Sequence, residues 1–87
     1  MKPYKEDKVS ENTFIRTFYN DVDSGELTWH IDREDRMIES IEETDWKFQI
    51  DNELPINISG KILIPKGVYH RIIKGTGDLK VKLQKLN

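Results

Sequence analysis

The stretch Gly60–Arg71, GKILIPKGVYHR, constrains the fold most, because it combines two extended segments with one fixed turn. Residues 62–64 are apolar on both faces, which is typical of a short buried strand. Pro65 ends that strand because it has no N–H to donate to a ladder. Gly67 permits the positive φ of a tight turn. The pattern therefore predicts a strand–turn–strand unit that points His70 into whatever the sheet encloses.

Similar short segments recur along the rest of the chain. They are rich in β-branched and aromatic residues and are separated by clusters of Gly, Asn, Asp, Ser and Pro. This spacing is typical of antiparallel barrels and jelly rolls, so we predict an all-β fold, a small jelly-roll β-barrel of about seven short antiparallel strands. Residues 33–43 also fit a helical pattern, but the short strands on both sides favour a strand. The predicted strands are residues 13–19, 26–32, 37–42, 46–50, 62–64, 68–74 and 79–84.

The length and the composition predict one domain. A chain of 87 residues can hold one small core, and no repeat or linker divides it. Residues 1–12 are polar and rich in charge, so we predict a mobile N-terminal arm there, with the barrel domain over residues 13–87.

The charge pattern and the residue types exclude several classes of partner. Sixteen acids against fourteen bases give a net charge of −2, and no basic run contains interleaved aromatics, so no nucleic-acid partner is expected. No apolar run approaches the roughly 20 residues of a membrane helix, and the N-terminus lacks the apolar core of a signal peptide. We therefore expect no membrane partner and a cytoplasmic location. The absence of cysteine excludes thiolate metal sites.

The strand–turn–strand unit also carries a family motif. Gly60, Pro65, Gly67 and His70 resemble the second signature of the cupins, which is a glycine, a short spacer and then Pro-x-Gly-x-x-His. The spacer is one residue shorter here, and the asparagine that usually closes the signature is replaced by Lys74.

An earlier segment resembles the first cupin signature more loosely. Four residues separate Gly25 from His30, which corresponds to the first histidine of that signature, and Asp32 replaces the second. The glutamate position falls on Arg36 or Met37, with Asp35 one place earlier, and the closing glycine is absent.

The resemblance covers roughly residues 14–83 and implies a cupin-like barrel of the kind that often binds a divalent metal. Carried over by position, it implies His30 and His70 as metal ligands, with Asp32 as a substituted one. Independently of the family, His30 and Asp32 are two apart and share a strand face, and His70 adds a second imidazole. Two imidazoles and one carboxylate can bind Fe(II), Mn(II), Ni(II) or Zn(II) and leave positions open for a ligand.

Arg36 supports a second reading, in which the pocket is polar and holds no metal. A guanidinium at a ligand position repels a cation and can pair with Asp32. We predict Arg36, Asp35 and Gln49 as ligand-binding residues. Gln49 reaches the pocket only if Phe48 points outward into an interface.

The sequence leaves two functions open. One is a metal-dependent enzyme acting on a small sugar-like or acidic metabolite, and the other is a non-catalytic module that binds a small molecule with or without metal. We also predict a homodimer, because open jelly-roll sheets leave an edge and an apolar face to cover. Trp29, Phe14 or the N-terminal arm would supply the contact.

Overall fold

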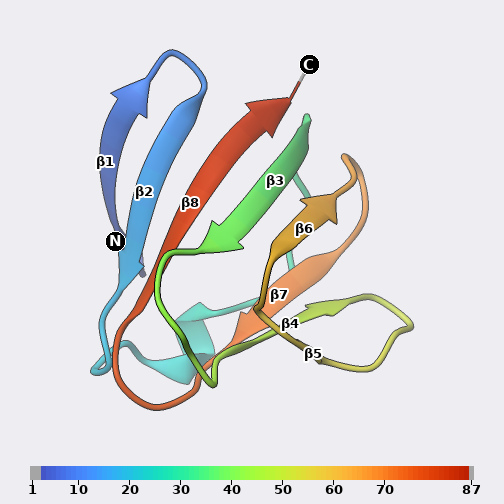
Figure 1. Ribbon diagram of the computed structural model, residues 1–87. Coiled ribbons are helices and arrows are strands. Elements are labelled where there is room, and N and C mark those ends of the chain that lie inside the picture. The colour runs from blue at the N-terminus through green and yellow to red at the C-terminus, as the bar shows by residue number, and fades with distance from the viewer. Residues whose placement is uncertain (1–2, 87) are drawn as a thin grey trace.

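Strands joined by loops and one short helical turn form the computed structural model, which describes residues 3–86 (Figure 1). The predicted all-β class is confirmed. Two antiparallel sheets form, one with the strand order β1-β2-β8-β3-β6 and one with the order β5-β4-β7. The elements are β1 (Lys5–Ser10), β2 (Thr13–Phe18), the short 3-10 helix η1 (Ser24–Glu26), β3 (Asp35–Ser40), β4 (Lys47–Ile50), β5 (Ile56–Asn57), β6 (Lys61–Ile64), β7 (His70–Ile73) and β8 (Leu79–Leu86).

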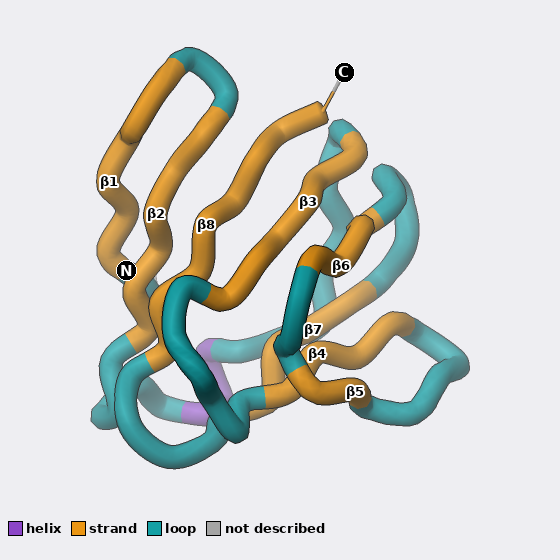
Figure 2. Tube along the Cα trace, viewed as in Figure 1, coloured by secondary structure: helices purple, strands orange, loops and turns teal. Residues whose placement is uncertain are grey.

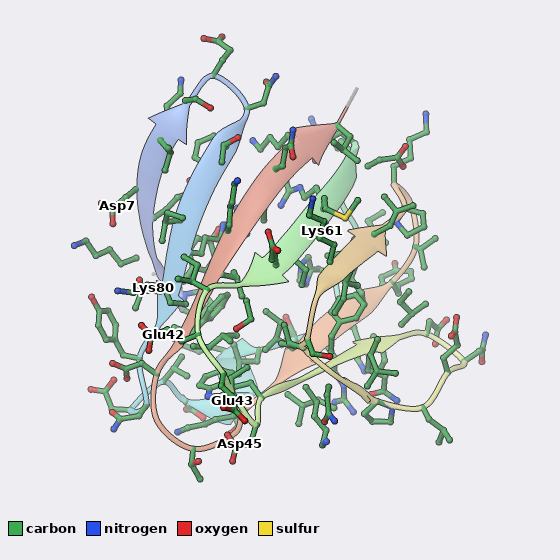
Figure 3. The ribbon with its side chains drawn as sticks, in the orientation of Figure 1. Asp7, Glu42, Glu43, Asp45, Lys61 and Lys80 are labelled. Atoms are coloured by element: carbon green, nitrogen blue, oxygen red, sulfur yellow. The ribbon has the colours of Figure 1, made fainter. Side chains whose placement is uncertain are left out.

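The last strand of the chain, β8, lies at the centre of the five-stranded sheet. It pairs with β2 on one side and with β3 on the other. Its apolar residues Leu79, Val81 and Leu83 are buried, while the alternate residues face solvent. Lys80 and Lys61 are both exposed and belong to the outer face of this sheet (Figure 3). Strict alternation along β8 thus separates the core side of the sheet from the water side.

The core lies where the inner faces of the two sheets meet. Trp46 and Phe48 are almost completely buried and come from β4 of the three-stranded sheet and the residue before it. Phe18 of β2 and Leu79 of β8 come from the five-stranded sheet. The rings of Phe18 and Trp46 have centroids 6.1 Å apart. The indole Nε1 of Trp46 donates to the carbonyl of Gly77 at 3.1 Å, which satisfies the one polar atom of a fully buried side chain.

The N-terminal segment differs from its prediction as a mobile arm. Residues 5–10 form β1, which pairs with β2 at the edge of the larger sheet. The segment has the composition of a tail because an edge strand exposes most of its side chains, and charges protect such an edge. Residues 1–2 of the predicted arm, and residue 87 at the end of the predicted barrel domain, lie outside the described residues.

The strand predicted over residues 26–32 was wrong. Ser24–Glu26 forms the helical turn η1 instead, and the chain then runs irregularly to a single β-bridge at His30 (Figure 2). The cause is local, because the side chain of Asp23 caps the turn by accepting from the N–H of Gly25 at 2.9 Å. Among the described residues, no helix has the length and the apolar character needed to cross a membrane.

The remaining elements are close to their predicted positions. Residues 35–40 form a strand and not the alternative helix. Between the predicted strands 46–50 and 62–64, the chain contains the two-residue strand β5, which pairs with β4. β1 and β5 add two strands to the prediction and the strand over residues 26–32 is lost, so eight strands are found between residues 3 and 86 where about seven were predicted.

Candidate metal centre

The turn between β6 and β7 is held against the segment that precedes β3. Gly67 has a φ of 74°, and its N–H donates to the carbonyl of Asp32 at 3.0 Å. The N–H of Lys66 donates to Oδ1 of Asp35 at 2.8 Å. These two hydrogen bonds bring the start of β7 next to residues 30–32, so the site depends on them.

His30 and His70 face each other across the single β-bridge. The N–H of each residue donates to the carbonyl of the other at 3.0 Å. Residues paired in this way project their side chains to the same face, and the two imidazole rings lie edge to face with centroids 4.3 Å apart. The bridge therefore sets two histidines side by side without a regular strand at His30.

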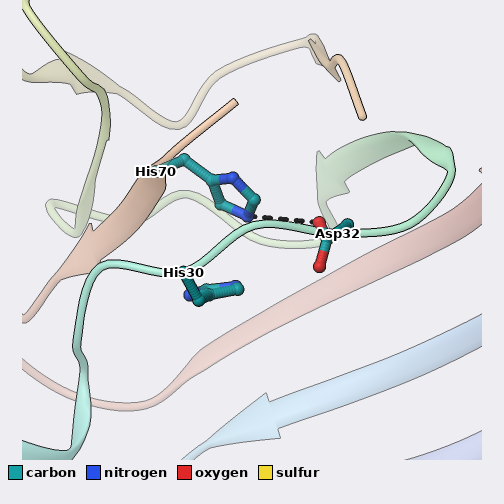
Figure 4. Close-up of side chains that lie close together, drawn as sticks. All are labelled: His30, Asp32 and His70. Atoms are coloured by element: carbon teal, nitrogen blue, oxygen red, sulfur yellow. Dashed lines mark ion pairs between the residues drawn. The ribbon is translucent and has the colours of Figure 1, made fainter. Parts of the chain in front are cut away.

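Asp32 completes the group (Figure 4). Its Oδ2 lies 3.2 Å from Nε2 of His70, and one potential ligand atom from each of the three residues lies within 4.8 Å of the others. Burial alone would raise the pKa of Asp32, but the contact with His70 and the charge of Arg36 outweigh burial and lower that pKa below its ordinary value. The side chain of Asp32 is only 7% exposed, so it is a buried carboxylate.

Backbone hydrogen bonds fix the orientation of both imidazoles. Nδ1 of His70 lies 2.9 Å from the carbonyl of Val68, and Nδ1 of His30 lies 3.0 Å from the carbonyl of Thr28. A carbonyl only accepts, so each Nδ1 carries a hydrogen, and in the neutral ring Nε2 then presents a lone pair. This is the arrangement that metal-binding histidines adopt.

The orientation of His70 leaves two acceptors facing each other. Oδ2 of Asp32 is buried and has no hydrogen-bond donor among residues 3–86. With His70 in its neutral form, Oδ2 and Nε2 are both lone-pair atoms 3.2 Å apart. A positive charge is required at this place, supplied either by a proton on Nε2 or by a metal ion. The donor set fits a divalent transition metal, since it provides two imidazole nitrogens and one carboxylate.

Arg36 lies beside the cluster and is held by two carboxylates. Its Nη1 is 3.3 Å from Oδ1 of Asp32, and its Nε donates to Glu34 at 2.8 Å. Its side chain is 14% exposed. The pairing of Arg36 with Asp32 that the sequence predicted as an alternative is thus present in the structure. It involves Oδ1 of Asp32, whereas Oδ2 faces His70.

A cavity of about 340 Å³ opens next to these residues. His30, Asp32, Arg36 and His70 all line it, and the rest of the wall is mostly apolar. A volume of this size is within the range of small-molecule sites.

The other two residues predicted to bind a ligand do not line this cavity. Asp35 instead braces the turn through the N–H of Lys66. Gln49 accepts from Arg71 at 3.0 Å and donates to the carbonyl of Glu53. Phe48 is 1% exposed and fills the core, so the outward orientation that Gln49 required does not occur.

Two residues of the cavity wall were not predicted from the sequence. Arg16 lines the cavity from β2, and Tyr4 lines it from the segment before β1. A signal for Arg16 was available, because Phe14, Arg16 and Phe18 alternate on one strand face, and a charged residue between two inward aromatics is unusual. Tyr4 carried no comparable signal, since it lies in a segment with the composition of a tail.

The fold corresponds to that of the cupins. Neither protein-family models nor curated proteins match the chain. Solved structures do match, and they show that the chain has the cupin fold, which agrees with the resemblance found in the sequence.

Three of these structures illustrate the similarity. A cupin 2 conserved barrel domain protein from Leptotrichia buccalis is 17% identical with a TM-score of 0.70, over 97% of this chain and 40% of that one. HppE with Co(II), in complex with Tris buffer, is 13% identical with a TM-score of 0.73, over 99% of this chain and 55% of that one. A cupin domain from Bordetella pertussis is 12% identical with a TM-score of 0.60, over 97% and 92%. The chain thus spans about half or less of the first two proteins.

Proposed function

We propose that this chain binds a divalent transition metal through Nε2 of His30, Nε2 of His70 and the carboxylate of Asp32, and that it holds a small metabolite in the adjoining cavity. The observation that carries the proposal is the contact between Oδ2 of Asp32 and Nε2 of His70, at 3.2 Å, in a buried place without another donor to Oδ2. The lone pairs of Asp32 Oδ2 and His70 Nε2 would both serve as ligands to a bound metal ion, which would remove the repulsion between them.

The chemistry of the donors and the structural neighbours support the same proposal. Iron, manganese, nickel and zinc all accept two imidazoles and a carboxylate. HppE, which shares the fold, has been solved with Co(II) and with Fe(II). A metal held by three protein groups keeps positions for an oxygen ligand, which it polarises as a Lewis acid.

The chain's own residues have distinct roles in this proposal. The carbonyls of Thr28 and Val68 engage Nδ1 of the two imidazoles, which leaves Nε2 of each ring for the metal. Arg36 lines the cavity beside Asp32 and attracts an acidic group of the metabolite. The apolar wall takes up the hydrocarbon part and excludes water from it.

Metal content is the direct test. Untagged protein purified without chelator is analysed by elemental mass spectrometry, before and after reconstitution. We expect near-stoichiometric metal in the wild type and its loss in His30→Ala, which removes one imidazole of the three-residue cluster. His30 is exposed, so this variant should fold.

Tyr69→Ala is the matched control, because Tyr69 is 53% exposed and precedes His70. Equal occupancy in wild type and His30→Ala would refute the assignment.

A second function, a metal-free binding module, is favoured by one specific contact. Arg36 lies 3.3 Å from Asp32, and its charge stabilises the carboxylate without any metal. Protonated His70 would then supply the remaining positive charge. A protein that stays metal-free after reconstitution with each of the four metals would support this function and exclude the first.

A homodimer and a cytoplasmic location belong to the same proposal and stay predictions. Three exposed apolar side chains, Trp29, Ile31 and Tyr69, lie around the bridge between residues 30 and 70 and favour an interface. Light scattering on the purified protein measures the oligomeric state.

A further inference from the structure

Arg16 occupies an inward position of β2 where an apolar residue is expected. Its neighbours on the same strand face are Phe14 and Phe18, and both pack in or against the core. A charge at such a position is costly unless it is paired. The strand register places Glu6 of β1 directly opposite, and Nε of Arg16 donates to Oε2 of Glu6 at 2.6 Å.

This ion pair does not use the whole guanidinium. A contact through Nε engages one edge, and the opposite edge carries further Nη donors. The ring of Tyr4 supports the guanidinium plane, with Cζ of Arg16 4.2 Å from the ring centroid. The Arg16 side chain is 14% exposed and lines the cavity. Glu6 and Tyr4 thus hold Arg16 in one orientation at the cavity wall.

Arg36 is held in the same manner on another part of the wall. Its Nε donates to Glu34 at 2.8 Å, and it too is 14% exposed. Both arginines have a partner on β8, which lies between their strands. Arg16 of β2 is opposite Val81, and Arg36 of β3 is opposite Lys85. Four residues along a strand correspond to about 13 Å, so the two arginines come from separate positions along the inner face of the five-stranded sheet.

The wall between the two arginines is apolar. Ile38, Val81 and Leu83 line this part of the cavity from β3 and β8. Glu26 also lines the cavity, but it is exposed, so water screens its charge.

We propose that Arg16 is a second anion-binding group, and that the ligand of the cavity is a small organic acid with an apolar middle section. Its acidic group binds Arg16, and its other end extends toward Arg36 and the His30, Asp32 and His70 cluster. The position of this far end rests on the proposed function, whereas the role of Arg16 does not.

The test compares three six-carbon probes of equal length, adipate, hexanoate and hexanol, by titration calorimetry on wild-type protein. We expect adipate and hexanoate to bind more tightly than neutral hexanol. In Arg16→Gln the affinity for both acids should fall about tenfold to a hundredfold, as for the loss of a charge-assisted hydrogen bond. Hexanol binding should not change. Arg33→Gln is the matched control, because it removes the same charge from an exposed residue that does not line the cavity.

A second variant tests the proposal if Arg16→Gln does not fold. Glu6→Gln removes the negative charge that partly neutralises Arg16 and keeps Arg16 itself, so acid binding should become severalfold tighter, whereas a purely structural ion pair predicts no gain. Metal content is measured on the same samples. Unchanged metal with lost acid binding in Arg16→Gln supports the inference. Wild-type protein that binds the acids but holds no metal contradicts only the role of the cluster. Any of three results would overturn the role of Arg16. These are equal binding of hexanoate and hexanol, no acid binding at millimolar concentration, and unaltered acid affinity in Arg16→Gln.

Discussion

The side chain of Asp32 belongs to both interpretations of the site, the metal cluster and the Asp–Arg pair. Its Oδ1 faces Arg36 and its Oδ2 faces His70, so the carboxylate has a different partner on each oxygen. From the sequence, the metal cluster and the Asp–Arg pair were alternatives. In the structure, both are present, because a carboxylate offers two oxygens and about four lone pairs.

A second aspartate, Asp45, allows a prediction on pH. Its Oδ1 accepts from the N–H of Thr76 and its Oδ2 from the Thr76 hydroxyl, both at 2.8 Å, near the loops at one end of the molecule (Figure 3). The backbone hydrogen bond first, and the hydroxyl second, lower the pKa of Asp45 below its ordinary value of 3.8.

A carboxyl whose pKa is lowered in the folded state stabilises the fold above its unfolded pKa, and this contribution is lost as the pH falls through the folded pKa. We therefore expect Asp45→Asn to be less stable than wild type at pH about 6 and to approach it at pH about 3. Urea unfolding at both values measures the difference. The exposed Asp21→Asn is the control, and a gap that does not narrow in acid would contradict the prediction.

At the scale of elements, the loop after β7 depends on a close approach at Gly75. A Cβ added to Gly75 would lie 2.7 Å from the backbone nitrogen of Trp46 and would also meet Asp45. Two loops distant in sequence pack backbone to backbone here, and Trp46 itself is fully buried.

Gly75→Ala should therefore force the two loops apart. We expect a loss of about 1–3 kcal/mol in the free energy of unfolding, the usual cost of overpacking. Gly25→Ala is the matched control, since a Cβ at Gly25 meets its nearest atom at 3.4 Å, an ordinary contact. Equal unfolding midpoints for the two variants would show that the loops can separate at no cost.

At the scale of the whole molecule, β8 organises the fold. It is the only strand that joins the β1–β2 hairpin to the β3–β6 pair within residues 3–86. Leu79, at the start of β8, is completely buried and does not line the cavity.

Leu79→Ala should cost about 2–5 kcal/mol, because it removes buried methyl groups and leaves a cavity. Leu54→Ala, at a leucine that is 85% exposed, should stay within about 0.5 kcal/mol of wild type. Thermal and urea unfolding of the two variants measure both effects. A small effect of Leu79→Ala would mean that the two sheets do not share one cooperative core.

The sequence by itself determined the local features of this protein. Alternation gave the strands near β2, β4 and β8, and Pro65 with Gly67 gave the turn before His70. These features depend on residues close in sequence, whose side-chain directions follow from backbone periodicity.

Only the tertiary structure decided which faces meet. Arg16 reaches the cavity because β2 pairs with β8, and the polar segment of β1 becomes a strand because it pairs with β2. Asp35 and Gln49 turn away from the cavity because their hydrogen bonds brace a turn and a neighbouring strand. Strand order and register join segments far apart in the chain, and local patterns carry little information about that pairing.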